Sequence, residues 1–182
     1  MPSNFKKFLQ RFRVFSGFIL AAVYLVFARP DAISLAIGIP IALLGLALRA
    51  WACGHLRKSA ELDVSGPYAH TRNPLYLGTY LITMGFGVAS GVWWLCLLCI
   101  ALVLSIYWPV MNVEAEVLEK RLGEEYSEYA RNVPLLFPRL SPWKKSERKF
   151  DFRLYLKNSE HQAAIGIVAA TLILVAKAVF LG

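Results

Sequence analysis

Five apolar runs, separated by polar segments of very different lengths, set the pattern of this sequence. A helix needs about 20 residues to cross a bilayer, and the runs approach or reach that length. They predict membrane-spanning helices at residues 14–28, 32–51, 75–89, 92–110 and 163–181. Only Ser90-Gly91 separates the third run from the fourth, so these two helices are expected to form a tight hairpin. The expected fold is all-α, with one polytopic membrane domain over residues 1–182.

The longest polar segment, residues 111–158, lies between the last two predicted spans and is too long for a simple connector. Its first part, Met111–Arg131, predicts an amphipathic helix. Side chains of one face recur there at helical spacing: Glu114, Leu118, Leu122, Glu125 and Tyr129. Pro134, Pro138 and Pro142 are then expected to end the helix and give an extended stretch that folds back across the membrane surface.

The N-terminal residues 4–13 place phenylalanines and a leucine on one helical face, with basic side chains around it. This pattern is typical of an interfacial helix that lies on an anionic leaflet. The alternative is the flared start of the first span, and the pattern does not separate the two.

Composition and charge agree with a membrane protein. The chain is 57% hydrophobic, whereas soluble domains are nearer to half. A net charge of +8 raises the possibility of nucleic-acid binding, but 17 of the 20 lysines and arginines fall in three blocks, residues 1–13, 52–73 and 112–158. The connections between the blocks are nearly free of basic residues, which is the positive-inside pattern. It places the blocks and the N-terminus in the cytoplasm and the C-terminus on the other side, and no nucleic-acid partner is expected.

Several residues near the predicted spans are expected to have structural roles. Arg49 and Lys177 lie near span ends, where their charged groups can reach the interface. The basic cluster at residues 144–149 suits lipid headgroups, and a simple positive-inside anchor explains it equally well. Cys96 and Cys99 have metal-ligand spacing, but inside an apolar helix they are expected to be packing residues, and no metal site is predicted.

The stretch Gly66–Gly78 combines turn chemistry, positive charge and aromatic rings at the foot of the third span. Gly66-Pro67 predicts a turn, and Asn73-Pro74 predicts a helix start with Asn73 as the N-cap. The N-terminus of that helix favours a carboxylate or phosphate, and Arg72 strengthens such an anion site. A loop that caps a membrane helix is the plainer interpretation, but it does not account for Arg72 beside two tyrosines.

A second set of candidates follows the fourth span. Glu114 lies where that span leaves the bilayer, and Arg72 or a bound cation is its expected partner. Tyr126, Tyr129, Arg131 and Arg139 are placed to close over the same site. Each of these residues alone is more often structural than functional, and their convergence on one face of the membrane favours the functional interpretation.

No dinucleotide-binding fingerprint, P-loop, zinc-protease motif or nucleophile elbow is present. The run from Gly66-Pro67-Tyr68 through Arg72-Asn73-Pro74-Leu75-Tyr76-Leu77-Gly78 resembles the GPY…RHPxYxG motif of the isoprenylcysteine carboxyl methyltransferase and phospholipid methyltransferase superfamily. A second family motif also has a counterpart here, in Glu114-Ala115-Glu116-Val117-Leu118, Leu122-Gly123, Tyr126, Tyr129 and Val133-Pro134. Together the two motifs cover roughly residues 45–140. The chain departs from the family at Asn73, which replaces a histidine, and at Ala115, which replaces a second glutamate.

This resemblance implies an integral-membrane enzyme that binds S-adenosylmethionine at the cytoplasmic ends of its last helices and releases S-adenosylhomocysteine. The residues it implies for cofactor binding are Tyr68, His70, Arg72, Asn73, Pro74, Tyr76, Leu77, Gly78 and Glu114. For His70, which is not at the position of the family histidine, an exposed loop histidine is the alternative. Arg72, Glu114 and Arg131 are the catalytic candidates. Substrate-binding candidates are Tyr126, Tyr129, Arg131 and Arg139, and residues 111–158 are expected to cover the cofactor.

The acceptor is expected to be a lipophilic molecule in the membrane. An ionised carboxylate needs no general base, and the motifs supply arginines to position one, which favours carboxyl O-methylation of an isoprenylcysteine-like substrate. The alternatives are phospholipid N-methylation, an NADPH-dependent enzyme similar to sterol reductases, and a membrane protein without enzymatic activity. The acceptor is expected to enter between spans, past the small residues Gly45 and Gly78. The expected location is the inner or plasma membrane of a prokaryote or the endoplasmic reticulum of a eukaryote, with the site on the cytoplasmic side.

Overall fold

The computed structural model describes residues 19–57, 62–146, 148–158 and 160–181. These residues are helical without strands, so the all-α prediction is confirmed for the part of the chain described. Residues 19–27 form a helix that belongs to the first predicted span. It is followed by α2 (Ala32–His55), the short 3₁₀ helix η1 (Gly66–Ala69), α3 (Pro74–Ala89), α4 (Trp93–Leu122), α5 (Glu124–Asn132), α6 (Phe152–Lys157) and α7 (Glu160–Leu181). The predicted interfacial helix at residues 4–13 lies outside the described residues.

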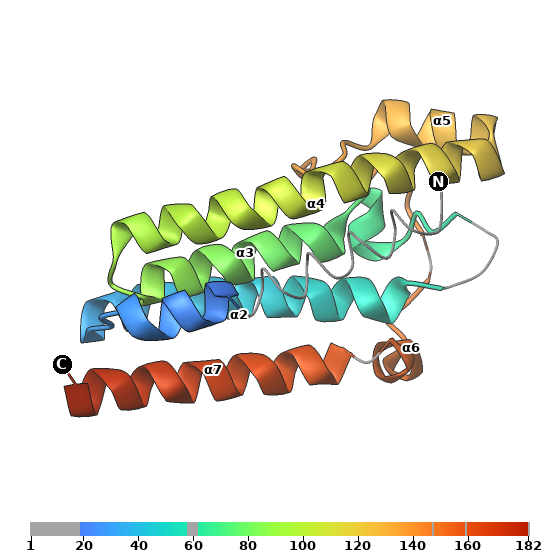
Figure 1. Cartoon of the computed structure of the whole chain (residues 1–182). Helices are drawn as coiled ribbons and strands as arrows, with labels where there is room; N and C mark the ends of the chain where they lie inside the picture. The colour runs from blue at the N-terminus through green and yellow to red at the C-terminus, as the bar shows by residue number, and fades with distance from the viewer. Residues whose placement is uncertain (1–18, 58–61, 147, 159, 182) are drawn as a thin grey trace.

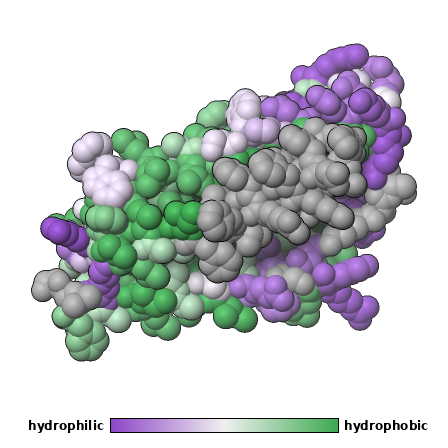
Figure 2. Space-filling view, viewed as in Figure 1, coloured by the Kyte–Doolittle hydropathy of each residue, from purple (hydrophilic) through white to green (hydrophobic). Residues whose placement is uncertain are grey.

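The long helices run side by side, and the short elements gather at one end (Figure 1). α2, α4 and α7 are long and apolar enough to span a membrane, and α3 is a shorter apolar helix. Apolar side chains cover the visible sides of the long helices, while hydrophilic ones concentrate at the end that carries α5 (Figure 2). Apolar residues that face outward from a helix bundle suit contact with lipid tails. The chain is therefore an all-α polytopic membrane protein.

Small residues allow α2 and α3 to pack with their backbones almost in contact. A Cβ added at Gly45 would lie 2.6 Å from the carbonyl oxygen of Gly78, and one added at Gly85 would lie 2.4 Å from the backbone nitrogen of Ala42. Close approach through small residues is the usual way in which membrane helices associate. The structure thus places Gly45 and Gly78 inside a helix–helix contact, where we had expected them to border an access route for the acceptor.

The α3–α4 hairpin forms as predicted, and Gly91 in its turn has a positive φ of 69°. The backbone nitrogen of Arg29 donates to the carbonyl oxygen of Ser90 at 2.7 Å, which ties the first connection to this turn. Nearby, Ala28, Ala89, Leu95 and Leu174 form a buried cluster that joins four helical segments. Lys177, expected to reach the interface, donates instead to the backbone carbonyl oxygen of Leu25.

The amphipathic helix predicted over Met111–Arg131 is not one helix. α4 continues without interruption from the apolar part of the chain to Leu122, and Gly123 then reverses the direction with φ 58° and ψ −129°. This backbone conformation is essentially restricted to glycine, so the chain turns here and α5 begins at Glu124. As a result α5 lies back against the end of α4 (Figure 1).

After α5 the described residues of the chain are non-helical up to Asp151, as the three prolines predict, and the short helix α6 follows at Phe152. α7 begins at Glu160, three residues before the predicted span, and this brings a carboxylate against α2. Arg49 Nε donates to Glu160 Oε1 at 2.6 Å, and Arg49 Nη1 donates to Thr79 Oγ1 at 2.7 Å. The guanidinium of Arg49, which was expected to reach the interface, is held by a partner 111 positions away.

Candidate active site

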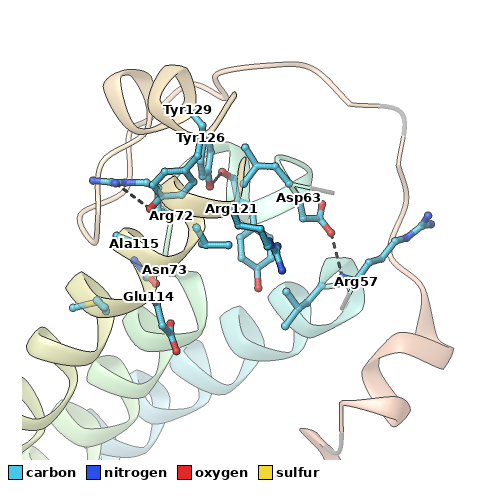
Figure 3. Close-up of a pocket in the computed structure, with 14 residues that line it drawn as sticks. Arg57, Asp63, Arg72, Asn73, Glu114, Ala115, Arg121, Tyr126 and Tyr129 are labelled. Carbon is cyan, nitrogen blue, oxygen red and sulfur yellow. Dashed lines mark hydrogen bonds between the residues drawn. The ribbon is translucent and has the colours of Figure 1, made fainter. Parts of the chain in front are cut away.

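A pocket of about 310 Å³ opens at the end of the molecule where η1, α4 and α5 meet. Figure 3 shows side chains from these elements directed toward a common space. Its volume lies at the lower end of the range for small-molecule sites. Six of the residues predicted from the sequence line it: Tyr68, Arg72, Asn73, Glu114, Tyr126 and Tyr129.

The loop from Gly66 to Asn73 builds one wall. Gly66 has a φ of 54°, which allows the turn that starts η1 and buries Tyr68. The backbone nitrogen of Arg72 donates to the carbonyl oxygen of Pro134 at 2.9 Å, and Thr71 Oγ1 donates to that of Leu136 at 2.9 Å. The motif loop and the chain that follows α5 are thus held together by hydrogen bonds.

Asn73 occupies the N-cap position of α3, with Pro74 as the first helical residue, as predicted. Its side chain does not cap the helix, however, because Nδ2 donates to the carbonyl oxygen of Leu135 at 3.0 Å. The amide therefore fixes the segment after α5. The first-turn N–H groups of α3 receive no bond from the Asn73 side chain.

Arg72 reaches the pocket with part of its hydrogen-bonding capacity unused. Nη1 donates to the hydroxyl oxygen of Tyr126 at 3.3 Å. Nε is buried and has no hydrogen-bond partner among the described residues. A buried donor without a partner is costly, so this atom marks a place where a ligand acceptor would be stabilising.

Glu114 lies at the exposed lip of the pocket, where α4 leaves its apolar part. Its Oε1 accepts a hydrogen bond from the hydroxyl of Tyr76 at 2.9 Å. Arg72, the partner that we expected for Glu114, bonds to Tyr126 instead. The carboxylate is therefore oriented by a neutral hydroxyl and keeps its negative charge available to a cation.

The aromatic side chains that line the pocket among the described residues are Tyr68, Tyr126 and Tyr129. The ring centroids of Tyr126 and Tyr129 are 6.1 Å apart, and Trp143 packs 5.6 Å from Tyr129 on the outer side. Tyr129 also donates its hydroxyl to the carbonyl oxygen of Tyr68 at 2.7 Å. Burial raises the pKa of Tyr68 and of Tyr129 above that of an ordinary phenol, so both stay protonated at physiological pH.

Other predicted site residues lie elsewhere. His70 Nδ1 is 2.8 Å from the carbonyl oxygen of Arg139, and Arg139 Nη1 donates to that of Asn132 at 2.9 Å. Arg131 pairs with Glu124 at 3.2 Å on an exposed surface. The structure does not bring these three predicted residues to the pocket wall.

The predicted residues at the start of α3 likewise lie outside the pocket wall. Pro74 is buried in the first turn of α3, and Gly78 faces α2. Tyr76 donates to Glu114 at the edge of the site, and neither Tyr76 nor Leu77 is among the described residues that line the pocket.

The rest of the wall comes from residues that the sequence analysis did not propose for the site: Leu56, Arg57, Leu62, Asp63, Met111, Ala115, Leu118 and Arg121. Those on α4 share one face with Glu114, at intervals of three and four residues. That spacing could have identified these residues from the sequence, because side chains three and four positions from Glu114 lie on the same face of the helix. No comparable pattern in the sequence identifies Asp63, because this residue lies before the first motif.

Among the described residues, no group of three or more histidine, cysteine, aspartate or glutamate side chains is arranged to hold a metal ion. The charged groups on the pocket wall are two carboxylates and three arginines. This set suits an organic ligand that carries both signs of charge.

Comparison with known families identifies the segment that contains this site. Residues 41–125 match the family model described as phospholipid methyltransferase. The matched segment covers just under half of the chain and is similar to the membrane methyltransferase superfamily that the two motifs indicate. The match covers α2 from Ile41, the motif loop, α3 and α4, and thus most of the pocket wall. That family is described by methyl transfer to phospholipids, and the match alone leaves the acceptor of this chain open.

Two curated relatives are similar over part of their length. The nickel-cobalt-cadmium resistance protein NccN of Alcaligenes xylosoxydans xylosoxydans is 33% identical over 107 residues, which cover 58% of this chain and 48% of the relative. The cobalt-zinc-cadmium resistance protein CzcN of Cupriavidus metallidurans is 31% identical over 137 residues, or 71% of this chain and 62% of the relative. The chain thus spans less than two thirds of either relative. No solved structure matches it significantly.

Proposed function

We propose that this protein transfers a methyl group from S-adenosylmethionine to a lipophilic acceptor in the bilayer, on the cytoplasmic side. The observation that carries the proposal is the pocket in which Arg72 and Asn73 of the first motif meet Glu114 of the second. These residues come from distant parts of the chain, and the family match indicates a methyltransferase.

The residues on the wall fit the cofactor. S-Adenosylmethionine has a sulfonium cation, an ammonium group, a carboxylate, two ribose hydroxyls and an aromatic base. Glu114 suits the cationic part, and the unpaired Nε of Arg72 suits the carboxylate. The tyrosines of the wall add aromatic surface for a cation or a base. When bound, the cofactor supplies an electrophilic methyl group. The chain has to align it and exclude water.

The wall chemistry favours an acceptor that needs no deprotonation. Tyr68 and Tyr129 stay protonated, because burial raises the pKa of each. Both carboxylates on the wall already accept hydrogen bonds, Glu114 from Tyr76 and Asp63 from Ser65. An acceptor that is ionised at neutral pH requires only positive charge to orient it. We therefore favour the carboxylate of an isoprenylcysteine-like molecule and O-methylation.

Phospholipid N-methylation is the second candidate, and the description of the matching family favours it. The amine of a phosphatidylethanolamine-type headgroup must lose a proton before it attacks. Glu114, exposed at the lip of the pocket, is the carboxylate placed to take that proton.

Cofactor binding to detergent-purified protein tests the shared part of both candidates. S-Adenosylmethionine should bind and NADPH should not. Arg72→Ala should weaken S-adenosylmethionine binding about 10- to 100-fold, which corresponds to the loss of charge-assisted hydrogen bonds. Arg153→Ala, on the exposed surface of α6, is the matched control and should bind like the wild type. Binding of NADPH alone would replace the proposal with a reductase, and binding of neither by folded protein would contradict enzymatic function.

Two acceptors separate the finer alternatives. Radiolabelled S-adenosylmethionine can be supplied with N-acetyl-S-farnesylcysteine or with phosphatidylethanolamine vesicles. Label in a base-labile ester of the first supports carboxyl methylation. Label in the lipid headgroup supports N-methylation, which should fall steeply in Glu114→Gln, while Glu125→Gln on the exposed face of α5 retains activity.

The two relatives are named for resistance to nickel, cobalt, zinc and cadmium. We propose that a contribution of this protein to metal tolerance would act through the methylated membrane component. The support is the pocket, whose mixed charges suit an organic ligand, while the described residues form no group of three metal-ligating side chains.

A further inference from the structure

Asp63 is a charged residue of the pocket wall that belongs to neither family motif. It lies on the loop before η1, and only 6% of its side chain is exposed. Figure 3 shows Asp63 and Glu114 on different sides of the pocket, one on the loop and the other on α4. A carboxylate so deeply buried requires hydrogen-bond partners for its oxygens.

The hydrogen bonds of Asp63 are distributed unevenly between its two oxygens. Oδ1 accepts from Ser65 Oγ at 2.7 Å and from the Ser65 backbone nitrogen at 3.4 Å, and Arg148 Nη1 lies 3.9 Å away. Among the described residues, Oδ2 accepts a single hydrogen bond, from the backbone nitrogen of Arg57 at 3.3 Å. Each carboxylate oxygen can accept about two bonds. Oδ2 therefore retains capacity for a donor from the pocket.

The buried side chain of His55 contacts Ser65, the residue that donates to Asp63. His55 Nδ1 lies 3.0 Å from Ser65 Oγ, and both side chains are almost inaccessible. Ser65 has one hydroxyl proton and donates it to Asp63, so its oxygen must accept the proton on His55 Nδ1. Gly66 leaves room for the imidazole, since an added Cβ would lie 2.7 Å from Nε2. The chain His55–Ser65–Asp63 thus runs from the end of α2 to the pocket wall.

We propose that Asp63 Oδ2 accepts a hydrogen bond from the ribose 2′-hydroxyl of S-adenosylmethionine, and that Ser65 and His55 position its carboxylate. This inference rests on the proposed methyltransferase function. The acceptor arrives from the bilayer, so the methyl-bearing sulfonium belongs near Glu114, where α4 leaves its apolar part. The nucleoside half then extends toward the loop that carries Asp63. A ribose hydroxyl that donates to this fixed carboxylate oxygen forms a charge-assisted hydrogen bond.

Binding of S-adenosylhomocysteine and of its 2′-deoxy analogue tests the assignment by calorimetry on detergent-purified full-length protein. The wild type should prefer the first ligand about tenfold, because the analogue loses one charge-assisted bond. Asp63→Asn should weaken S-adenosylhomocysteine binding about tenfold and remove the preference. In that variant the amide oxygen at position 63 is expected to accept from Ser65. The NH₂ group then faces the pocket, where the wild type has the acceptor Oδ2.

Ser65→Ala tests the positioning role and provides a second variant if Asp63→Asn folds poorly. It should weaken S-adenosylhomocysteine about fivefold and reduce the preference over the analogue, because Asp63 loses its strongest restraint. A merely structural role of Ser65 would weaken both ligands equally. Asp151→Asn, at the exposed N-cap of α6, is the control and should change neither affinity.

The outcomes distinguish this inference from the function on which it rests. If the wild type binds no S-adenosylhomocysteine, the proposed methyltransferase function fails. If the wild type binds and Asp63→Asn keeps both the affinity and the preference, only the role of Asp63 is overturned. Equal weakening of both ligands in Asp63→Asn and Ser65→Ala would show that the carboxylate serves a different part of the cofactor and would overturn the ribose assignment.

Discussion

Tyr126 and Tyr129 lie nearly one turn apart on α5, and their hydroxyls have different partners. Tyr129 donates to the backbone carbonyl oxygen of Tyr68, and both side chains are buried. Tyr126 instead accepts a bond from the guanidinium of Arg72. Burial raises the pKa of Tyr129, so the neutral, donating form is favoured in the folded state. Its hydrogen bond is consequently kept throughout the physiological range and would be lost only in strongly alkaline solution.

Removing each hydroxyl should separate stability from binding. Tyr129→Phe leaves the Tyr68 carbonyl without its donor and should lower the free energy of unfolding by about 1–2 kcal/mol. Tyr126→Phe should change stability less and should weaken S-adenosylmethionine binding several-fold, because the Arg72 guanidinium loses its restraint. Thermal unfolding and calorimetric binding measure the two effects. Equal effects of both variants on both quantities would contradict separate roles for the hydroxyls.

At the residue scale, the sequence identifies those residues of the site that belong to one of the two motifs. Tyr68, Arg72 and Glu114 were expected at the site, and all line the pocket. Asp63 and Arg121 were not expected, because their position depends on how the loop before η1 and the end of α4 meet. No local pattern in a single sequence predicts a contact between two such distant segments.

At the scale of elements, the contact of α2 with α3 depends on the absence of side chains. Gly45→Ala would place a Cβ 2.6 Å from the Gly78 carbonyl oxygen, closer than such contacts occur, so the helices must separate. We expect a loss of about 1–3 kcal/mol in stability, measured as a lower unfolding temperature. Gly166→Ala in α7 is the matched control, because a Cβ there meets no atom within 4 Å.

The same variant decides whether Gly45 borders the access route of the acceptor. Helix separation should reduce methylation of short- and long-chain acceptors by the same factor. A selective loss for long-chain acceptors, with stability unchanged, would restore the interpretation that the sequence suggested.

The sequence predicts apolar elements better than the turns between them. The hairpin at Ser90-Gly91 forms as expected, because two residues between two long apolar helices allow only a tight turn. The division of Met111–Arg131 into two helices was missed, since helical periodicity continues on both sides of Gly123. Only the backbone conformation of Gly123, with φ 58°, reveals that the chain turns there.

At the scale of the whole molecule, α7 lies beyond the segment that matches the family and is attached to it by a buried ion pair. Glu160 is 4% exposed, and its carboxylate accepts from Arg49 Nε at 2.6 Å and from Arg49 Nη2 at 3.0 Å. Arg49 also bonds to Thr79, so one guanidinium joins α2, α3 and α7. The separation of 111 positions between the partners explains why the sequence alone did not reveal this pair.

Removing Glu160 should cost more than the attraction alone, because the partly buried guanidinium of Arg49 would lose its counter-charge. Glu160→Gln should destabilise the protein by about 3–5 kcal/mol, and the double variant Arg49→Met with Glu160→Met should recover much of the loss. Glu124→Gln, which breaks the exposed pair with Arg131, should cost no more than about 1 kcal/mol. Thermal unfolding in detergent gives all three values. If α7 only supports the bundle, the double variant should bind S-adenosylhomocysteine like the wild type, and weaker binding by this stable variant would place α7 in the functional unit.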